Sequence, residues 1–240
     1  MANHVANRLT IEGDSKEIAK MLKEIRGKAE DGSTLLIDFN KLIPMPEALN
    51  ITAGSQANNA LKHYTQYLND CAAVSDMCVS NGLSENEQSE LLRSLLEKYE
   101  KPDGNDSPLF RLGEQCHNNV RDYGHPTWYE WKKWNWGSKG DAFDQMQTYN
   151  NVIDFYTANT GVSPIAAALA EKYPSLSFSY MYADQDWGCN VGEFEYEGGQ
   201  CVYSNIPASE SDEATAIARE LLGEYEWDSD EEEYEDDMEI

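Results

Sequence analysis

Residues 128–143 read WYEWKKWNWGSKGDAF, and this stretch holds four of the six tryptophans of the chain. It separates a polar, helix-rich half of the sequence from a half whose patterns are those of strands. Trp128 and Trp131 are three residues apart and would share one face of a short helix. We interpret four rings, those of Trp128, Trp131, Trp134 and Trp136, as structural anchors that pack into the core of the fold.

Lysines lie among these rings, which leaves a second interpretation open. Lys132, Lys133 and Lys139 interleave with the tryptophans, and a basic, aromatic groove is how many proteins bind single-stranded nucleic acid. The formal net charge of −26 argues against it, because neutralisation of phosphates by lysine and arginine supplies most of that affinity. Packing is therefore the favoured interpretation.

The sequence before the tryptophans predicts a strand, a helix and a second strand. Residues 4–12 are typical of a strand, and Asp14 with Glu17 would form a capping box at the start of a helix. The apolar run at residues 35–39 predicts a buried strand, which would complete a βαβ-like opening.

Residues 55–121 change in character and predict a helical insertion. Apolar residues recur there at helical spacing in three segments. Ser84 and Glu87 form a second capping box before the middle segment. The insertion divides an α+β domain made of residues 1–54 and 122–222.

The half after the tryptophans returns to strand patterns. Strands are predicted at 151–156 and 177–182, and Gly198-Gly199 is typical of the turn of a hairpin over residues 193–205. In that hairpin Cys201 would lie opposite Tyr196. The remaining predicted elements are two helices, one from Ser163 to before Pro174 and one over residues 209–222.

The acidic charge is concentrated at the C-terminus. Residues 208–240 contain 15 Asp or Glu and one Arg. We expect residues 223–240 to be disordered, because like charges repel one another. A solubilising tail is one interpretation, and an interaction tail is the other, since aromatic residues are interleaved with the acids. The candidate partner-binding residues are Glu224, Glu226, Trp227, Asp228, Asp230, Glu231, Glu232, Glu233, Tyr234, Glu235, Asp236 and Asp237.

No catalytic or metal-binding pattern rises above background. The five cysteines form no C-x-x-C pair, and the four histidines lack the spacing of zinc ligands. Cys116 beside His117, and the loop with Asp184 and Asp186, are better explained as structural. Nucleotide-binding glycine motifs are absent. We therefore expect no enzyme, no cofactor and no metal.

The location and the partners follow from charge and cysteine usage. Unpaired cysteines and the lack of an apolar leader predict a reduced, cytoplasmic setting in a host cell. An acidic field repels nucleic acid and anionic membranes and attracts basic protein surfaces. We expect a monomer or homodimer whose partner is a host protein with a basic surface.

The motifs around the tryptophans resemble those of the YubB-like ferredoxin-like family of phage and plasmid proteins. Residues 128–131 and 135–144, WYEW and NWGSKGDAFD, are similar to its NWYDW and NWGTKW-D/N-A-Y pattern, and residues 38–46, DFNKLIPMP, to its FNKIIPMP. Gly140 departs from it by replacing a second tryptophan. The resemblance implies a ferredoxin-like antiparallel sheet with helices on one face. It also implies that a mobile genetic element encodes the protein. It implies no chemistry, so no catalytic residue is carried over.

These expectations combine into one leading hypothesis. A phage- or plasmid-encoded acidic inhibitor would occupy a basic nucleic-acid-binding surface of a host defence protein by DNA mimicry. CRISPR effectors, restriction enzymes and nucleases are the candidate targets. The alternatives are a structural or oligomerisation protein of a mobile element, or an uncharacterised enzyme.

Overall fold

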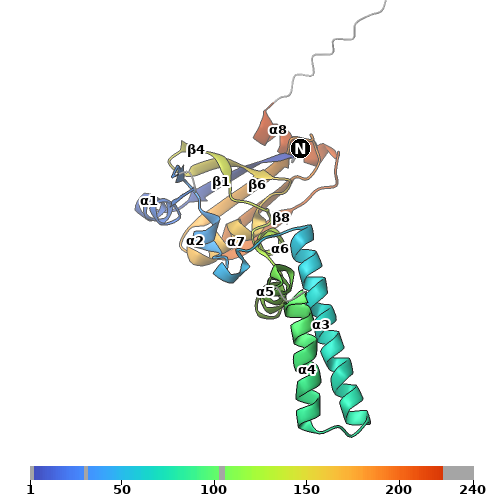
Figure 1. Cartoon of the computed structure of the whole chain (residues 1–240). Helices are drawn as coiled ribbons and strands as arrows, with labels where there is room; N and C mark the ends of the chain where they lie inside the picture. The colour runs from blue at the N-terminus through green and yellow to red at the C-terminus, as the bar shows by residue number, and fades with distance from the viewer. Residues whose placement is uncertain (1–2, 30–31, 103–105, 224–240) are drawn as a thin grey trace, which may run out of the picture.

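A six-stranded antiparallel sheet forms the body of the protein in the computed structural model, which describes residues 3–29, 32–102 and 106–223 (Figure 1). The strand order is β4–β5–β1–β6–β7–β8. The strands are β1 (His4–Glu12), β4 (Phe143–Tyr149), β5 (Val152–Ala158), β6 (Ser177–Asp184), β7 (Gly192–Glu197) and β8 (Gln200–Asn205). The first strand of the chain lies in the middle, between β5 and β6, so the sheet needs both ends of the sequence.

The main core lies on one face of this sheet, under three helices: α1 (Ser15–Glu24), α2 (Phe39–Leu42) and α7 (Ser163–Lys172). Leu9 and Ile11 of β1 point into it, because alternate residues of a strand share a face. Tyr180 of β6 is fully buried there, and its hydroxyl donates to Asn7 Oδ1 at 2.7 Å. Burial raises the pKa of Tyr180 well above its ordinary value, so this side chain is a neutral hydrogen-bonding anchor.

The opposite face is covered at one end by α8 (Asp212–Leu222). Ala214, Ile217 and Ala218 of α8 pack on Met181 and Ala183 of β6. The α+β, antiparallel class is confirmed, but α8 departs from the expected single helical face. The reason is that Met181 and Ala183, which alternate with the core tyrosines, make this end of the second face apolar as well.

The prediction of a buried strand at residues 35–39 is wrong. Only Thr34–Leu35 (β3) pairs, with Gly27–Lys28 (β2), in a separate two-stranded sheet, so no βαβ unit forms. Asp38 breaks the run by capping α2, where its Oδ1 accepts from the Asn40 amide at 2.9 Å. Ile37 and Phe39 are buried as expected, but from a loop and a helix.

Strand β4 was not predicted from the sequence, because it lies at the sheet edge and its residues are mostly polar or exposed. The side chain of Gln145 explains how the edge is covered: its Oε1 accepts from the amides of Leu36 and Ile37 at 2.6 and 2.9 Å.

Three helices span the predicted insertion: α3 (Ser55–Ser80), α4 (Glu85–Glu100) and α5 (Pro108–Tyr123). Helices α3 and α4 run side by side away from the sheet (Figure 1). The Ser84–Glu87 capping box is confirmed. Helices α3 and α5 pack closely at Gly113, where an added Cβ would lie 2.2 Å from the Ala60 carbonyl oxygen.

Two short helices complete the connections, a 3-10 turn (Glu47–Leu49) and α6 (Trp128–Asn135). The Asn119 side chain of α5 donates to the carbonyls of Ala48 and Pro126 at 2.9 and 3.0 Å, which attaches the helical block to the body. Within the described ranges, no helix has both the length and the apolar character needed to span a membrane.

Candidate protein-binding surface

Two of the four tryptophans lie in the main core. Trp131 is 7% exposed and Trp136 is 1% exposed, and their rings meet edge to face with centroids 6.1 Å apart. Trp136 Nε1 donates to the Ile43 carbonyl at 2.9 Å. Its ring also meets Phe39 edge to face at 5.8 Å. These rings tie α6 to α2 and to the loop that follows α2.

Trp134 is not an anchor, which corrects the interpretation of all four rings as core residues. Its side chain is 77% exposed and lies beside the His125 ring, with centroids 6.2 Å apart. Trp128 is only partly buried. Helix α6 is two turns long, and it is Trp136, at its C-cap, that packs against Trp131 in the main core.

Two of the three lysines of this stretch lie against its own rings, and Lys133 Nζ is 5.5 Å from the Tyr129 ring centroid. Lys132 Nζ lies 4.3 Å from the Trp136 ring centroid and 3.9 Å from Asp141 Oδ2. Burial raises the pKa of Asp141, and the charge of Lys132 opposes that shift. With Trp131 and Trp136 buried, the stretch offers no row of open rings on which bases would stack.

The other candidate sites of the sequence have structural explanations in their contacts. Cys116 is fully buried, and burial raises the pKa of its thiol, which disfavours the thiolate needed of a nucleophile. Asp184 accepts from the side chains of Asn3 and Asn190 at 3.2 and 3.0 Å. Among the described residues, no group of three or more His, Cys, Asp or Glu is placed to hold a metal ion.

The uncovered end of the second sheet face carries a set of carboxylates. Glu193, Glu195 and Glu197 alternate along β7 with core residues, so they point to this face about 7 Å apart. Strand pairing places Glu195 opposite Ser179 of β6, and it places Glu12 of β1 opposite Ser177 of the same strand. We call Glu12, Glu193, Glu195, Glu197 and Glu213 the acidic face.

The first helical turn of α8 brings Glu213 to β7. One amide, that of Asn205, donates at 3.0 Å to both Glu193 Oε1 and Glu213 Oε1. The Tyr203 hydroxyl also donates to Glu193 Oε1, at 2.9 Å. This bond and the two carboxylate charges raise the pKa of Tyr203. Neutral donors thus hold two like charges together, and neither carboxylate has an ion-pair partner among the residues that the structure describes.

A shallow hollow of about 150 Å³ lies within the acidic face. Ser177 and Ser179 line it from β6, Glu12 from one side and Glu195 and Glu197 from the other. The serines are short, so they leave space that longer side chains would fill. The three glutamates are exposed. A lysine or arginine side chain of a partner would meet carboxylates on both sides of this hollow.

None of the acidic-face carboxylates takes part in an ion pair within the part of the chain that the structure describes. Arg8, on the same sheet face, pairs instead with Asp154 at 2.7 Å. The acidic face is therefore available to external cations. The sequence showed the alternating glutamates of β7, but the approach of Glu12 depends on β1 lying beside β6, which local patterns do not reveal.

The candidate partner-binding residues of the tail all lie outside the described residues, namely Glu224, Glu226, Trp227, Asp228, Asp230, Glu231, Glu232, Glu233, Tyr234, Glu235, Asp236 and Asp237.

Comparison with known proteins supports the fold class. Residues 133–239 match the family model described as the ferredoxin-like domain in Api92-like protein. The ferredoxin-like fold is thereby confirmed for the part that holds β4 to β8. The match is to Api92-like proteins, so the narrower YubB-like resemblance stays a prediction.

A solved structure and the curated proteins add little to this. The crystal structure of a protein api92 from Yersinia pseudotuberculosis is similar at 13% sequence identity and a TM-score of 0.42, covering 88% of this chain and 100% of its own. No curated protein matches the sequence.

Proposed function

We propose that this protein is an acidic inhibitor, encoded by a phage or plasmid, that binds a basic nucleic-acid-binding surface of a host defence protein. The observation that carries the proposal is the acidic face, where exposed carboxylates surround a hollow and have no counter-ion among the described residues. Its carboxylates would take the place of phosphates. CRISPR effectors, restriction enzymes and nucleases are the target classes.

Electrostatics supports this choice over direct nucleic-acid binding. The net charge of −26 repels phosphates and draws basic surfaces at a rate that falls with added salt. Lys132, the most central lysine among the tryptophans, is already engaged with Trp136 and Asp141. The backbone that carries these carboxylates is already held in the sheet, so no loop has to be ordered on binding, which favours affinity.

Capture from a bacterial lysate, with matched charge variants, tests the proposal. The test variant is Glu12→Gln, Glu195→Gln and Glu197→Gln combined. The control removes the same three charges from exposed positions of α4, as Glu85→Gln, Glu90→Gln and Glu97→Gln. We expect the unmodified chain and the control to retain a nucleic-acid-binding protein at low salt and to inhibit it, and the test variant to lose both. If both variants lost capture and inhibition equally, net charge alone would explain the effect. If both retained them equally, the acidic face would be excluded as the binding surface.

Deletion of residues 223–240 separates the folded surface from the tail. Inhibition that survives this deletion assigns binding to the acidic face. Loss of inhibition, with the circular dichroism of the body unchanged, assigns it to the tail. Either result is compared with the two glutamine variants in the same assay.

A second candidate function is self-association through β8. This strand is the free edge of the sheet, and Val202 and Tyr203 are 56% and 44% exposed there. Free strand edges are templates for pairing with another chain, whereas Gln145 covers the β4 edge. Light scattering that gives a dimer, which Val202→Lys converts to a monomer, would support this function. A monomer at high concentration would count against it.

A further inference from the structure

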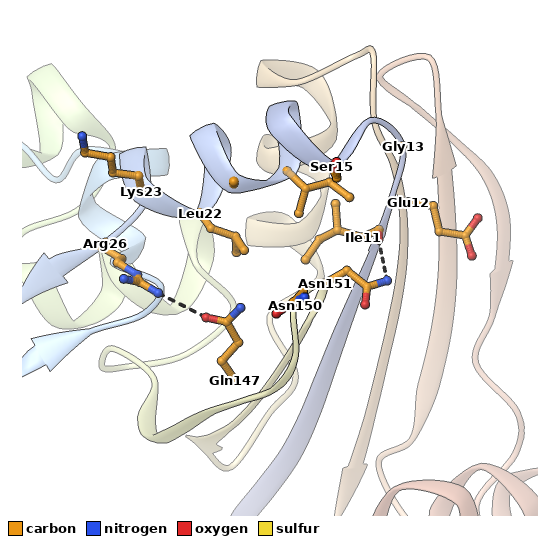
Figure 2. Close-up of a pocket in the computed structure, with 12 residues that line it drawn as sticks. Ile11, Glu12, Gly13, Ser15, Leu22, Lys23, Arg26, Gln147, Asn150 and Asn151 are labelled. Atoms are coloured by element: carbon orange, nitrogen blue, oxygen red, sulfur yellow. Dashed lines mark hydrogen bonds between the residues drawn. The ribbon is translucent and has the colours of Figure 1, made fainter.

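A second hollow, larger than the one in the acidic face, lies between α1 and the turn that joins β4 to β5, and Glu12 lines both. Its volume is about 650 Å³, within the range of about 300–1,000 Å³ typical of small-molecule sites. Figure 2 shows α1 along one side and the turn with Asn150 and Asn151 along the other. Two segments more than a hundred residues apart in sequence therefore build it.

The floor of the pocket is apolar and rigid. Ile11 of β1 and Ile18 and Leu22 of α1 line it, and all three belong to the main core. Ala19 lies at the rim, exposed, where its small side chain leaves the opening clear. The floor would take the apolar part of a ligand without rearrangement.

One end of the pocket is cationic. Lys23 and Arg26, at and just beyond the end of α1, line it, and both are exposed. Arg26 donates to Gln147 Oε1 at 3.1 Å, which fixes its guanidinium toward the pocket (Figure 2). Within the described ranges neither cation has a carboxylate partner.

Two carboxylates, Glu24 beside Lys23 in the sequence and Glu12 in the pocket lining, are directed elsewhere. Glu24 accepts from the Tyr173 hydroxyl at 2.9 Å and lies 3.9 Å from Lys20 Nζ. Glu12 is the one carboxylate among the described residues that line the pocket, and Figure 2 shows it at the end opposite Arg26, pointing outward. Two unpaired cations in a chain of net charge −26 thus share one end of an apolar pocket.

We propose that this pocket binds a small amphiphilic organic anion. The apolar body of the ligand lies on Ile11, Ile18 and Leu22, and its carboxylate or phosphate head meets Lys23 and Arg26. Arginine suits such heads because its planar guanidinium donates two parallel hydrogen bonds. Asn150, on the wall that faces α1, adds neutral polar groups. The proposed inhibition uses the other face of the sheet, and Glu12 is the one described residue that lines both sites.

Binding of 8-anilinonaphthalene-1-sulfonate, an apolar fluorophore with one anionic group, tests the pocket on the full chain. We expect saturable binding that Arg26→Gln with Lys23→Gln weakens about tenfold, as the loss of charge-assisted hydrogen bonds predicts. The matched control, Lys16→Gln with Lys20→Gln, removes two exposed charges of the same helix that do not line the pocket, and should bind as the unmodified chain does. Ala19→Phe should block binding, and circular dichroism checks that each variant is folded.

Competition then defines the ligand class. Decanoate and decyl phosphate should displace the fluorophore, and the stronger of the two identifies the preferred head group, while decanol should displace it at least tenfold more weakly. The proposal is overturned if the Arg26 and Lys23 variant binds as tightly as the control, if Ala19→Phe leaves binding intact, or if decanol competes as well as both anions.

Discussion

Replacing Trp136 with phenylalanine tests whether the tryptophan stretch stabilises the folded protein by packing in its core. The change keeps an aromatic ring but removes the indole N–H that donates to the Ile43 carbonyl at 2.9 Å. An acceptor left without its donor costs about 1–3 kcal/mol. The smaller ring also leaves roughly 40 Å² of apolar contact unmade, worth about 1 kcal/mol at 25 cal/mol per Å².

The sum predicts a loss of about 2–4 kcal/mol in the free energy of unfolding, because Trp136 is 1% exposed and its neighbours are fixed. For a chain of this length the loss corresponds to a fall in Tm of roughly 4–16 °C. Urea unfolding followed by circular dichroism measures it. The matched control is Trp134→Phe, the same chemical change at a site that is 77% exposed, which should change stability by less than about 0.5 kcal/mol.

The reasoning is refuted if the two variants lose the same stability, or if Trp134→Phe loses more. Either result would mean that the two rings do not differ in the way their burial predicts, so that core packing is not their main contribution to stability. The same pair of variants should inhibit or bind a partner alike at a temperature where both are folded, since the acidic face holds neither ring.

Three further predictions concern stability. The pKa of Asp141 is raised by burial, so the folded state favours its protonated form and loses stability as pH rises through that pKa. Urea titrations should therefore find Asp141→Asn more stable than the unmodified protein at pH 7.5, with a gain that shrinks toward pH 4. A less stable variant at pH 7.5 would show that pairing with Lys132 outweighs burial. Gly113→Val should lower the free energy of unfolding by about 1–3 kcal/mol, because its side chain would overlap the Ala60 carbonyl oxygen where α3 and α5 pack; an unchanged urea midpoint would mean that these helices separate freely. Ser84→Ala should cost about 1 kcal/mol by removing the cap of α4, and a thermal melt unchanged within 1 °C would contradict that.

Much of the sheet was predictable because its signals are local. Residues 4–12 form β1 as predicted, and the hairpin places Tyr196 opposite Cys201 as the Gly198-Gly199 turn required. Local signals failed where a tertiary contact decides the structure. Strand β4 is polar and needs Gln145 to cover its edge. Ile37 reads as part of a strand and is buried from a loop.

The candidate surfaces were predictable only in part. The alternating glutamates of β7 are visible in the sequence, but Glu12 and Glu213 reach them through strand order and helix placement. The pocket beside α1 carries no sequence signal, because its walls come from opposite halves of the chain.

Mutual exclusion with duplex DNA tests the central claim most directly. The affinity of a captured nuclease, restriction enzyme or CRISPR effector for its duplex DNA would be measured with increasing amounts of this protein, at two salt concentrations. We predict simple competition that weakens at high salt, because both ligands would occupy one basic surface. Formation of a ternary complex with an unchanged affinity for DNA would contradict the account.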